Sequence, residues 1–290
     1  FNHDESLVDV PISDFDSNED YTTADKTEGF KDDQELVTSV VSDLLRPIYD
    51  FDFLSAPASA QYRAFQWLIY EDSLQLTNSY NYLEQNSDIG NWIVQRFSLV
   101  AFYYSTTDDT EGGEGGEDVI GWGKGSRWLS GVHECQWQGV TCGTDFGYGT
   151  NHIKNAIWDS ETKSPSKLNI TTKLDLPHHD LKGTIPIDLL ALKDLEILIL
   201  NGNQFSGQIP GWLSEMKSLE ALLLENNLFT GSIPKELSFL PNLHQARMAG
   251  NLISGEVPQE LCKLNLDVLT TDSLGSNPKV KCPCCKNRLT

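Results

Sequence analysis

The chain has 290 residues, of which 42 are acidic and 21 are basic, so its formal net charge is −21. This charge argues against nucleic acid and anionic membrane surfaces as partners, because both are bound through basic patches. No apolar stretch of the sequence is long enough to span a bilayer. The chain begins with Phe1 rather than Met, so we expect a processed product or a fragment.

The N-terminal part is predicted to contain an acidic arm followed by helices. Residues 1–33 are acidic and poor in core residues, which predicts a flexible tail or a docking arm. Residues 34–130 are predicted to form a helical region, in which residues 106–125 make an acidic, glycine-rich loop without the ligand order of a calcium loop. Apolar residues recur at helical spacing over residues 34–45, 59–71 and 87–104.

Two cysteines and a tryptophan open the next stretch, residues 131–173. They follow the pattern C-x-W-x-G-V-x-C, which starts at Cys135 and ends at Cys142. A polar insertion then precedes the regular repeats. Before that insertion, the residues predicted to begin a degenerate repeat are Ile153, Ala156 and Trp158.

Residues 174–268 repeat with a period of 24 residues. Leucines such as Leu198 and Leu200 alternate with other residues, so each repeat is predicted to contain a short strand. An Ile-Pro or Val-Pro pair follows and suits an extended segment, because proline fixes φ and lacks an N–H group. The recurring positions are Gly183, Gly207, Gly231 and Gly255, then Pro186, Pro210, Pro234 and Pro258, and finally Asn203, Asn227 and Asn251, with His179 in the asparagine position of the first repeat.

The unit L-x-x-L-x-L-x-x-N-x-F-x-G-x-I-P resembles the plant-type leucine-rich repeat. The resemblance implies asparagines that bond to the backbone of neighbouring coils. It also implies an N-terminal cap with a Cys135–Cys142 disulfide and Trp137 packed on the first coil. Together with the sequence Y-R-A-F-Q-W-L from Tyr62 to Leu68 and the terminal Cys-Pro-Cys-Cys at 282–285, the order of segments from about residue 55 to 285 resembles the leucine-rich repeat proteins of diatoms. We therefore predict an α/β fold, a short right-handed leucine-rich repeat solenoid of about 5–6 coils, with a helical N-terminal capping region and disulfide caps at both ends.

Residues 262–290 hold the other cysteines and are predicted to form a C-terminal cap. Adjacent cysteines rarely bridge each other, so Cys262 pairs with Cys284 or Cys285, and Cys282 takes the remaining one. Of these arrangements we choose Cys262–Cys284 with Cys282–Cys285. A zinc site at these cysteines is the alternative, and it is disfavoured because no second Cys-x-x-Cys or His pair has suitable spacing.

No constellation of residues in the sequence indicates catalysis. His178, His179 and Asp180 invite a metal or acid–base interpretation, but His179 occupies the asparagine position of a repeat, which favours a structural role. The sequence has neither a Gly-x-Ser-x-Gly elbow nor a His-Glu-x-x-His helix. Cysteines paired in disulfides offer no thiolate nucleophile. We therefore expect no catalytic residue, no cofactor and no metal site.

The outward side chains of the repeat strands are the candidate binding residues. Ile197, Ile199 and Leu223 form an apolar centre, and contiguous exposed apolar residues indicate a contact site. Beside them, Glu225 and Arg247 are expected to pair across adjacent strands. The competing interpretation is that the helix at 36–45 or the acidic arm covers this patch. The complete set is Lys173, Asp175, Pro177, Ile197, Ile199, Asn201, Ala221, Leu223, Glu225, Gln245, Arg247 and Ala249.

The leading hypothesis is a secreted or cell-surface protein without enzymatic activity. The even number of cysteines indicates an oxidising compartment, and Asn169 begins an N-glycosylation sequon. The resemblance implies that the concave face recognises another protein or a component of the extracellular matrix, as in adhesion. The alternatives are a structural subunit of a larger extracellular assembly and an inhibitor of a polysaccharide-degrading enzyme.

Overall fold

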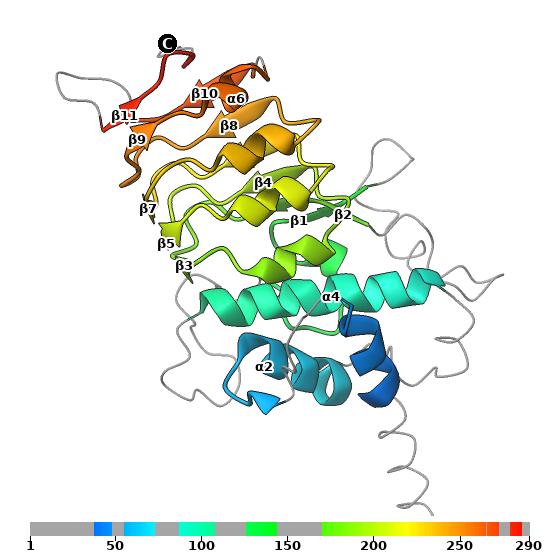
Figure 1. Cartoon of the computed structure of the whole chain (residues 1–290). Coiled ribbons are helices and arrows are strands. Elements are labelled where there is room, and N and C mark those ends of the chain that lie inside the picture. The colour runs from blue at the N-terminus through cyan, green and yellow to red at the C-terminus, as the bar shows by residue number, and fades with distance from the viewer. Residues whose placement is uncertain are drawn as a thin grey trace, which may run out of the picture.

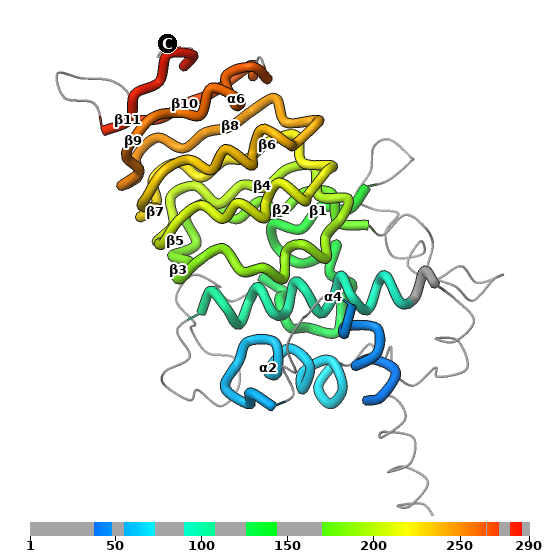
Figure 2. Tube along the Cα trace, in the orientation of Figure 1, coloured from blue at the N-terminus to red at the C-terminus, as the bar shows by residue number. Residues whose placement is uncertain are grey.

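The computed structural model describes residues 38–47, 55–72, 87–107, 126–143, 170–264, 266–272 and 279–285. Short strands are stacked one above the other, and helices lie across one end of the stack (Figure 1). The backbone trace follows nearly the same path in successive repeats (Figure 2). The predictions made for residues 1–33, for residues 108–125, for the degenerate repeat at 153–158 and for Asn169 lie outside the described residues.

Four helical segments of the described chain precede the repeats, and the last of them is the short 3-10 helix η4 (Glu134–Gln136). A helix covers residues 38–45, α2 (Ala60–Gln66) continues directly into a π-helix, η2 (Trp67–Glu71), and α4 (Ser87–Thr106) follows. Ser59 caps α2, because its Oγ accepts the N–H of Tyr62 at 3.0 Å. The first three segments therefore lie where the apolar spacing predicted them. The change from α to π geometry at Trp67 was not predicted.

A six-stranded sheet with the order β1-β2-β4-β6-β8-β10 runs through the repeats. Strands β2 to β10 are parallel, whereas β1 is antiparallel to β2. Parallel strands need a crossover connection, and here the remainder of each repeat supplies it. The strands are β1 (Val140–Cys142), β2 (Thr171–Asp175), β4 (Ile197–Ile199), β6 (Ala221–Leu223), β8 (Gln245–Arg247) and β10 (Val268–Thr270).

The return path of each repeat holds a second strand and then a short helix. The second strands are β3 (Lys182–Gly183), β5 (Gln204–Gln208) and β7 (Leu228–Thr230), which pair with one another, and β9 (Gly255–Glu256), which pairs with β11 (Val280–Lys281). The helices are η5 (Ile187–Ala191), η6 (Gly211–Glu215), η7 (Lys235–Phe239) and, in the last repeat, α6 (Gln259–Cys262).

The periodic prolines mark where these short helices begin. Each of the four helices follows directly on a proline with an extended backbone, which the proline ring favours. The prolines are Pro186, Pro210, Pro234 and Pro258.

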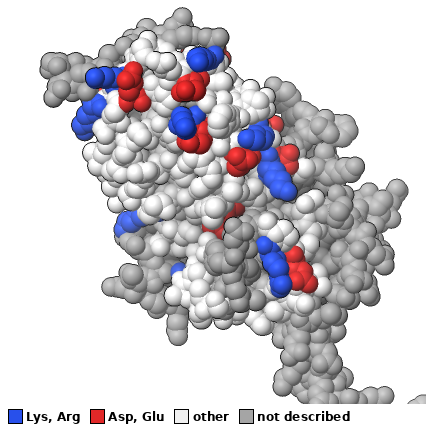
Figure 3. Space-filling model, in the orientation of Figure 1, with Lys and Arg blue, Asp and Glu red and all other residues white. Residues whose placement is uncertain are grey.

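On the face of the molecule seen in Figure 1, basic side chains lie beside acidic ones (Figure 3). That view therefore shows no patch of a single charge.

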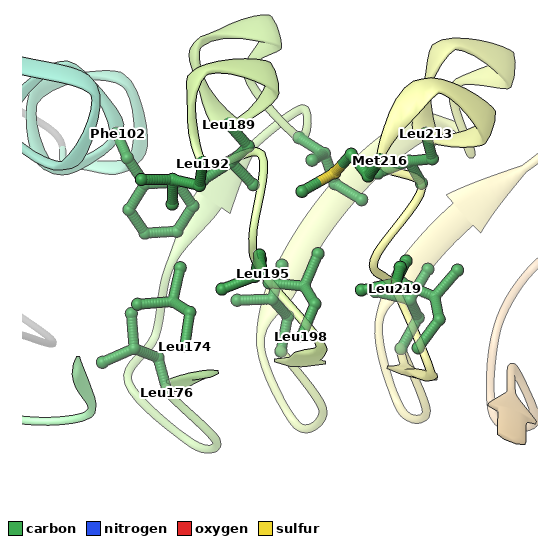
Figure 4. Packing of buried hydrophobic residues seen from close by; sticks show 14 of the residues in the cluster. Phe102, Leu174, Leu176, Leu189, Leu192, Leu195, Leu198, Leu213, Met216 and Leu219 are labelled. Carbon is green, nitrogen blue, oxygen red and sulfur yellow. The ribbon is translucent and has the colours of Figure 1, made fainter. Parts of the chain in front are cut away.

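The leucines of the repeats fill the space between the sheet and the short helices. Equivalent residues of neighbouring repeats lie next to each other, such as Leu174 and Leu198, or Leu195 and Leu219 (Figure 4). These side chains are fully buried. A single repeat would leave this apolar surface in water, so the repeats are stable only as a stack.

Helix α4 lies against the first repeat and reaches the second. The Phe102 ring of α4 contacts Phe205, with ring centroids 6.5 Å apart, and Phe205 stacks in turn on Phe229 at 6.2 Å. The Ser98 hydroxyl of α4 donates to the backbone carbonyl of Asp188 in η5 at 2.5 Å. Apolar and polar contacts thus join the helices to the repeats.

A buried charged cluster ties α4 to the segments on either side of it. The Arg96 guanidinium donates twice to the Asp72 carboxylate, at 2.7 and 2.8 Å, and once to Glu134 Oε2 at 3.1 Å. All three side chains are 0% exposed. The carbonyls of Ser130 and Val132 accept further hydrogen bonds from Arg96. Charges removed from water require such complete pairing.

The same cluster reaches the main sheet. Gln95 Nε2 donates to Glu134 Oε1 at 2.8 Å, and Gln95 Oε1 accepts the N–H of Thr171 in β2 at 2.7 Å. The rings of Trp67 and Trp137 lie 5.1 and 4.8 Å from the Arg96 guanidinium carbon. The cluster therefore connects the helices, the cysteine-containing segment before β1, and the first parallel strand.

His133 lies at the edge of this cluster as a buried, neutral side chain. Its ring stacks on Trp92 with centroids 5.0 Å apart, and its Nδ1 accepts the N–H of Cys135 at 3.2 Å. Burial lowers the pKa of His133 below its ordinary value of 6.5, while Glu134 raises it and Arg96 lowers it. The unfolded chain therefore binds a proton at this residue more readily than the folded chain.

Acidification is expected to destabilise the fold through His133. The pKa of His133 is lower in the folded chain than in the unfolded chain. The stabilisation that neutral His133 gives the fold is therefore fully present above pH 6.5 and is lost as the pH falls below that value. In the variant His133→Gln, this loss should disappear from the curve of unfolding free energy against pH. The measurement is chemical denaturation of both proteins from pH 7.5 to 5, and parallel curves in this range would contradict the assignment.

The three asparagines form the ladder that the resemblance implied. Asn227 Nδ2 donates to the carbonyls of Leu200 and Leu224 at 2.9 and 3.2 Å, and its Oδ1 accepts the N–H of Phe205 at 3.0 Å. Each asparagine thus satisfies buried backbone groups of its own repeat and of the preceding one. Equivalent bonds are made by Asn203 and Asn251.

The ends of the ladder differ from its middle. His179 holds the asparagine position of the first repeat, but it meets the ladder through its backbone, whose N–H donates to Asn203 Oδ1 at 2.9 Å. Its ring nitrogen Nδ1 lies 2.7 Å from the carbonyl two residues earlier. At the other end, Asp272 accepts the N–H groups of Gly250 and Asn251 at 2.8 and 3.0 Å. A carboxylate there takes the role of an amide oxygen.

All six cysteines are paired in the structure. The pairs are Cys135–Cys142, Cys262–Cys284 and Cys282–Cys285, the same pairs that the sequence analysis chose. The first includes the last residue of β1, and the second includes the last residue of α6. Disulfides therefore lie on both sides of the repeats.

Removal of the Cys262–Cys284 disulfide is expected to weaken the C-terminal end of the fold. The bond closes a sequence separation of 22 residues, so the double variant Cys262→Ser, Cys284→Ser should lose about 3 kcal/mol of stability through the larger entropy of the unfolded chain. Chemical denaturation without reductant measures the loss. An unchanged transition would contradict the prediction, and the variant should respond less to added reductant than the native chain.

Candidate binding surface

The outward side chains of the main sheet lie in continuous rows, because its parallel strands pair without a shift of register. Their neighbours along the strands, such as Leu198 and Leu222, are fully buried, so these rows face away from the core. One row is Lys173, Ile197, Ala221, Gln245 and Val268, and the next is Asp175, Ile199, Leu223, Arg247 and Thr270.

An apolar centre occupies the middle of both rows. Ile199 lies opposite Leu223, and Ile197 lies opposite Ala221. The first three of these side chains are half-buried, so they present apolar surface to solvent. The prediction that Ala221 presents an outward binding side chain is wrong, because this residue is only 6% exposed. Its short side chain lies between larger neighbours in the row and offers little contact area.

The charged residues of the face are largely engaged with their neighbours. Lys173 Nζ lies 2.7 Å from Asp175 Oδ2. With the Gln245 amide oriented so that its oxygen faces Arg247, that oxygen accepts from the guanidinium at 2.8 and 2.9 Å. The ion pair compensates the charge of Lys173, whereas the bond to a neutral amide satisfies donors of Arg247 but leaves its charge.

The expected pairing of Glu225 with Arg247 is wrong. Glu225 Oε1 instead accepts from the Thr270 hydroxyl at 3.2 Å, and none of the ion pairs among the described residues joins Glu225 to Arg247. The backbone register places these residues close together, but the conformations of two long side chains decide which hydrogen bonds form. Asn201 and Glu225 follow their strands and remain half-exposed, as do Pro177 and Ala249.

The helix over residues 38–45 does not cover the apolar centre. It packs on α4, since a Cβ added at Gly90 would lie 3.1 Å from Leu44 Cδ2. Figure 1 shows this helix on the far side of α4 from the sheet. One of the two proposed covering segments is therefore excluded over these residues, and the other, the acidic arm, lies outside the described residues.

The histidines near the first repeat do not form a catalytic arrangement with one another. His178 is exposed and has a φ of 56°, whereas the His179 ring turns to a backbone carbonyl. Among the described residues, no group of three or more His, Cys, Asp or Glu side chains is arranged to hold a metal ion. None of the helices described here is long and apolar enough to cross a membrane.

Comparison with known families identifies the repeats. The leucine rich repeat family model matches residues 194–216 and 218–240. A search of the curated proteins finds no match to the chain. Among solved structures, the chain is similar to the ectodomain of the plant membrane receptor kinase GASSHO1/SCHENGEN3 from Arabidopsis thaliana, with 36% identity over 36% of this chain and 12% of that one, and a TM-score of 0.31.

Two further similar structures also come from Arabidopsis thaliana. The BIR3–SERK2 complex gives 22% identity over 64% of this chain and 91% of that one, with a TM-score of 0.45. The ectodomain of the receptor kinase SOBIR1 gives 25% identity over 51% and 86%, with a TM-score of 0.37. The matched residues and the stacked parallel strands together show that this chain contains leucine-rich repeats and has the mixed α/β fold of such repeats.

Proposed function

We propose that this protein recognises another protein through the outward face of its main sheet and has no enzymatic activity of its own. The observation that carries the proposal is the half-buried apolar centre of Ile197, Ile199 and Leu223. An apolar cluster on an outward sheet face gains stability when a partner removes it from water, by about 25 cal/mol per Å².

The proposed setting is extracellular, at the cell surface or in the surrounding matrix. Three disulfides support it, because disulfides persist in oxidising compartments. Glycosylation at Asn169 and the narrower relation to diatom proteins belong to the same proposal. So does a right-handed solenoid of about 5–6 coils, bounded at one end by residues 34–173 and at the other by residues 262–290. No observation favours the assembly subunit or the polysaccharidase inhibitor over direct recognition.

The double variant Ile199→Asp, Leu223→Asp is expected to lose capture of its protein partner from a native surface extract. Two carboxylates at the apolar centre would have to be buried unpaired on binding, so the captured amount at a given concentration should fall at least tenfold. Immobilised native and variant proteins are compared by pull-down with quantitative mass spectrometry.

The matched control is the double variant Leu228→Asp, Leu252→Asp. These leucines are 47% and 51% exposed and lie on the return path rather than on the main sheet. This variant should capture the same proteins as the native chain. Equal capture by native protein and by the Ile199→Asp, Leu223→Asp variant would exclude the main-sheet face as the recognition site.

A further inference from the structure

A row of acidic residues borders the apolar centre on one side. Glu196, Glu220 and Asp267 each stand one residue before a strand of the main sheet, and His244 holds the same position in the repeat between the last two. Backbone hydrogen bonds of 2.7 to 3.0 Å join these four positions in order along the sheet. They therefore form a row beside Lys173, Ile197, Ala221, Gln245 and Val268.

The carboxylates of this row have no counter-charge in the described part of the chain. No ion pair or side-chain hydrogen bond there involves Glu196, Glu220 or Asp267. Glu196 and Asp267 are exposed, and Glu220 is half-buried. Glu196 and Glu220 precede neighbouring strands and are joined by a backbone hydrogen bond of 2.7 Å, so their like charges repel each other. Cationic groups of a partner would relieve this repulsion.

The basic side chains of the face do not pair with the acidic row, because they bond to other residues of the face. Lys173 pairs with Asp175 at 2.7 Å, and Arg247 donates to the Gln245 amide oxygen when that amide is oriented toward it. On the opposite border of the face, Glu225 is half-buried. Its carboxylate accepts a hydrogen bond from the Thr270 hydroxyl, which carries no charge. The apolar centre thus lies between carboxylates on two sides, which favours an approaching positive charge.

We infer that the partner segment bound by this face is cationic: an apolar side chain placed over Ile199 and Leu223, with lysine or arginine side chains beside Glu196 and Glu220. The inference rests on the proposed function and names the chemistry of its ligand. Lysine and arginine are suited to this arrangement because their aliphatic stems cover apolar surface while their charged ends reach a neighbouring carboxylate. An acidic or neutral segment would leave the carboxylates without a counter-charge.

The test uses a library of short displayed peptides selected on the immobilised full-length protein. Peptides are retained only if they lose binding to the Ile199→Gln, Leu223→Gln variant, which removes apolar surface without adding negative charge, and keep it on the Leu228→Gln, Leu252→Gln variant. The retained peptides are expected to be enriched in lysine or arginine next to an apolar residue. Their binding should weaken as salt is raised, because exposed charge pairs are screened.

A charge-removing variant then tests the acidic row itself. Glu196→Gln with Glu220→Gln should weaken the retained peptides about fivefold, the effect of two exposed charge pairs. The matched control is Glu256→Gln with Glu260→Gln, which removes two exposed carboxylates from β9 and α6 and should leave binding unchanged.

The possible outcomes separate this inference from the proposed function. Retained peptides without an excess of lysine or arginine, or with equal affinity for the Glu196→Gln, Glu220→Gln variant, would overturn the cationic partner while leaving the recognition face in place. If no selected peptide depends on Ile199 and Leu223, the recognition face fails and the inference fails with it.

Discussion

Replacement of Arg96 by methionine is expected to lower the free energy of unfolding by about 3 to 5 kcal/mol. Arg96 is 0% exposed and is the shared partner of the buried carboxylates of Asp72 and Glu134. Methionine fills a similar volume but supplies no charge, so both carboxylates would remain in the interior with an uncompensated charge. Equilibrium denaturation, followed by tryptophan fluorescence, measures the loss.

Two comparisons separate the charge effect from a general effect of substitution. Arg46→Met removes an exposed arginine that pairs with Asp43 at 3.4 Å and should change stability by less than about 1 kcal/mol. The triple variant Asp72→Asn, Arg96→Met, Glu134→Gln removes the three charges of this cluster and should recover part of the loss. Equal stability of the Arg96→Met and Arg46→Met variants would contradict the account of the cluster.

The variant Asn227→Ala is expected to lose about 4 kcal/mol. This asparagine is 4% exposed, and its amide bonds to the buried carbonyls of two leucines and to one N–H of the surrounding repeats, with a longer bond of 3.3 Å to the Glu225 carbonyl. Alanine would leave the Phe205 N–H without an acceptor inside the protein and would remove bonds from two carbonyls. An unsatisfied buried donor costs about 1 to 3 kcal/mol, and each lost bond costs about 1 kcal/mol more.

Asn242→Ala is the matched control for the ladder. Asn242 is exposed, and its Nδ2 donates a single bond to the Lys217 carbonyl at 3.0 Å. Water can replace that bond, so the loss should stay below about 1 kcal/mol. If Asn242→Ala destabilises the protein as much as Asn227→Ala, the ladder is not what joins neighbouring repeats.

The repeats could be predicted from the sequence because their physical requirements recur. Leu198 and Leu222 occupy equivalent positions 24 residues apart, and both are fully buried. Asn227 recurs with the same period because every repeat presents the same backbone groups to its neighbour. A periodic sequence therefore reports a periodic environment, which includes the inner and outer faces of each strand.

The buried cluster around Arg96 could not be predicted in this way. Asp72 and Glu134 lie 24 and 38 residues from Arg96 in the sequence, within a chain that has 42 acidic residues. Neither belongs to a repeat, so no period singles it out. Only the packing of the helices on the segment before β1 brings the three charges together.

The candidate face was predicted at the level of strand register and missed at the level of side chains. Ile199 and Leu223 share the face because strand alternation decides which way a residue points. The burial of Ala221 and the Glu225–Thr270 bond depend on the sizes and conformations of neighbouring side chains. The acidic row was missed because its residues stand just before the strands, outside the positions that alternation assigns to the face.

Hydroxyl-radical footprinting of the protein, free and bound to its captured partner, tests the recognition face most directly. The oxidation rates of Ile199 and Leu223 should fall on binding, because the partner excludes solvent from these side chains. The rates of Leu228 and Leu252 on the return path should stay unchanged. Protection of Leu228 and Leu252, with Ile199 and Leu223 oxidised as before, would contradict recognition through the main sheet.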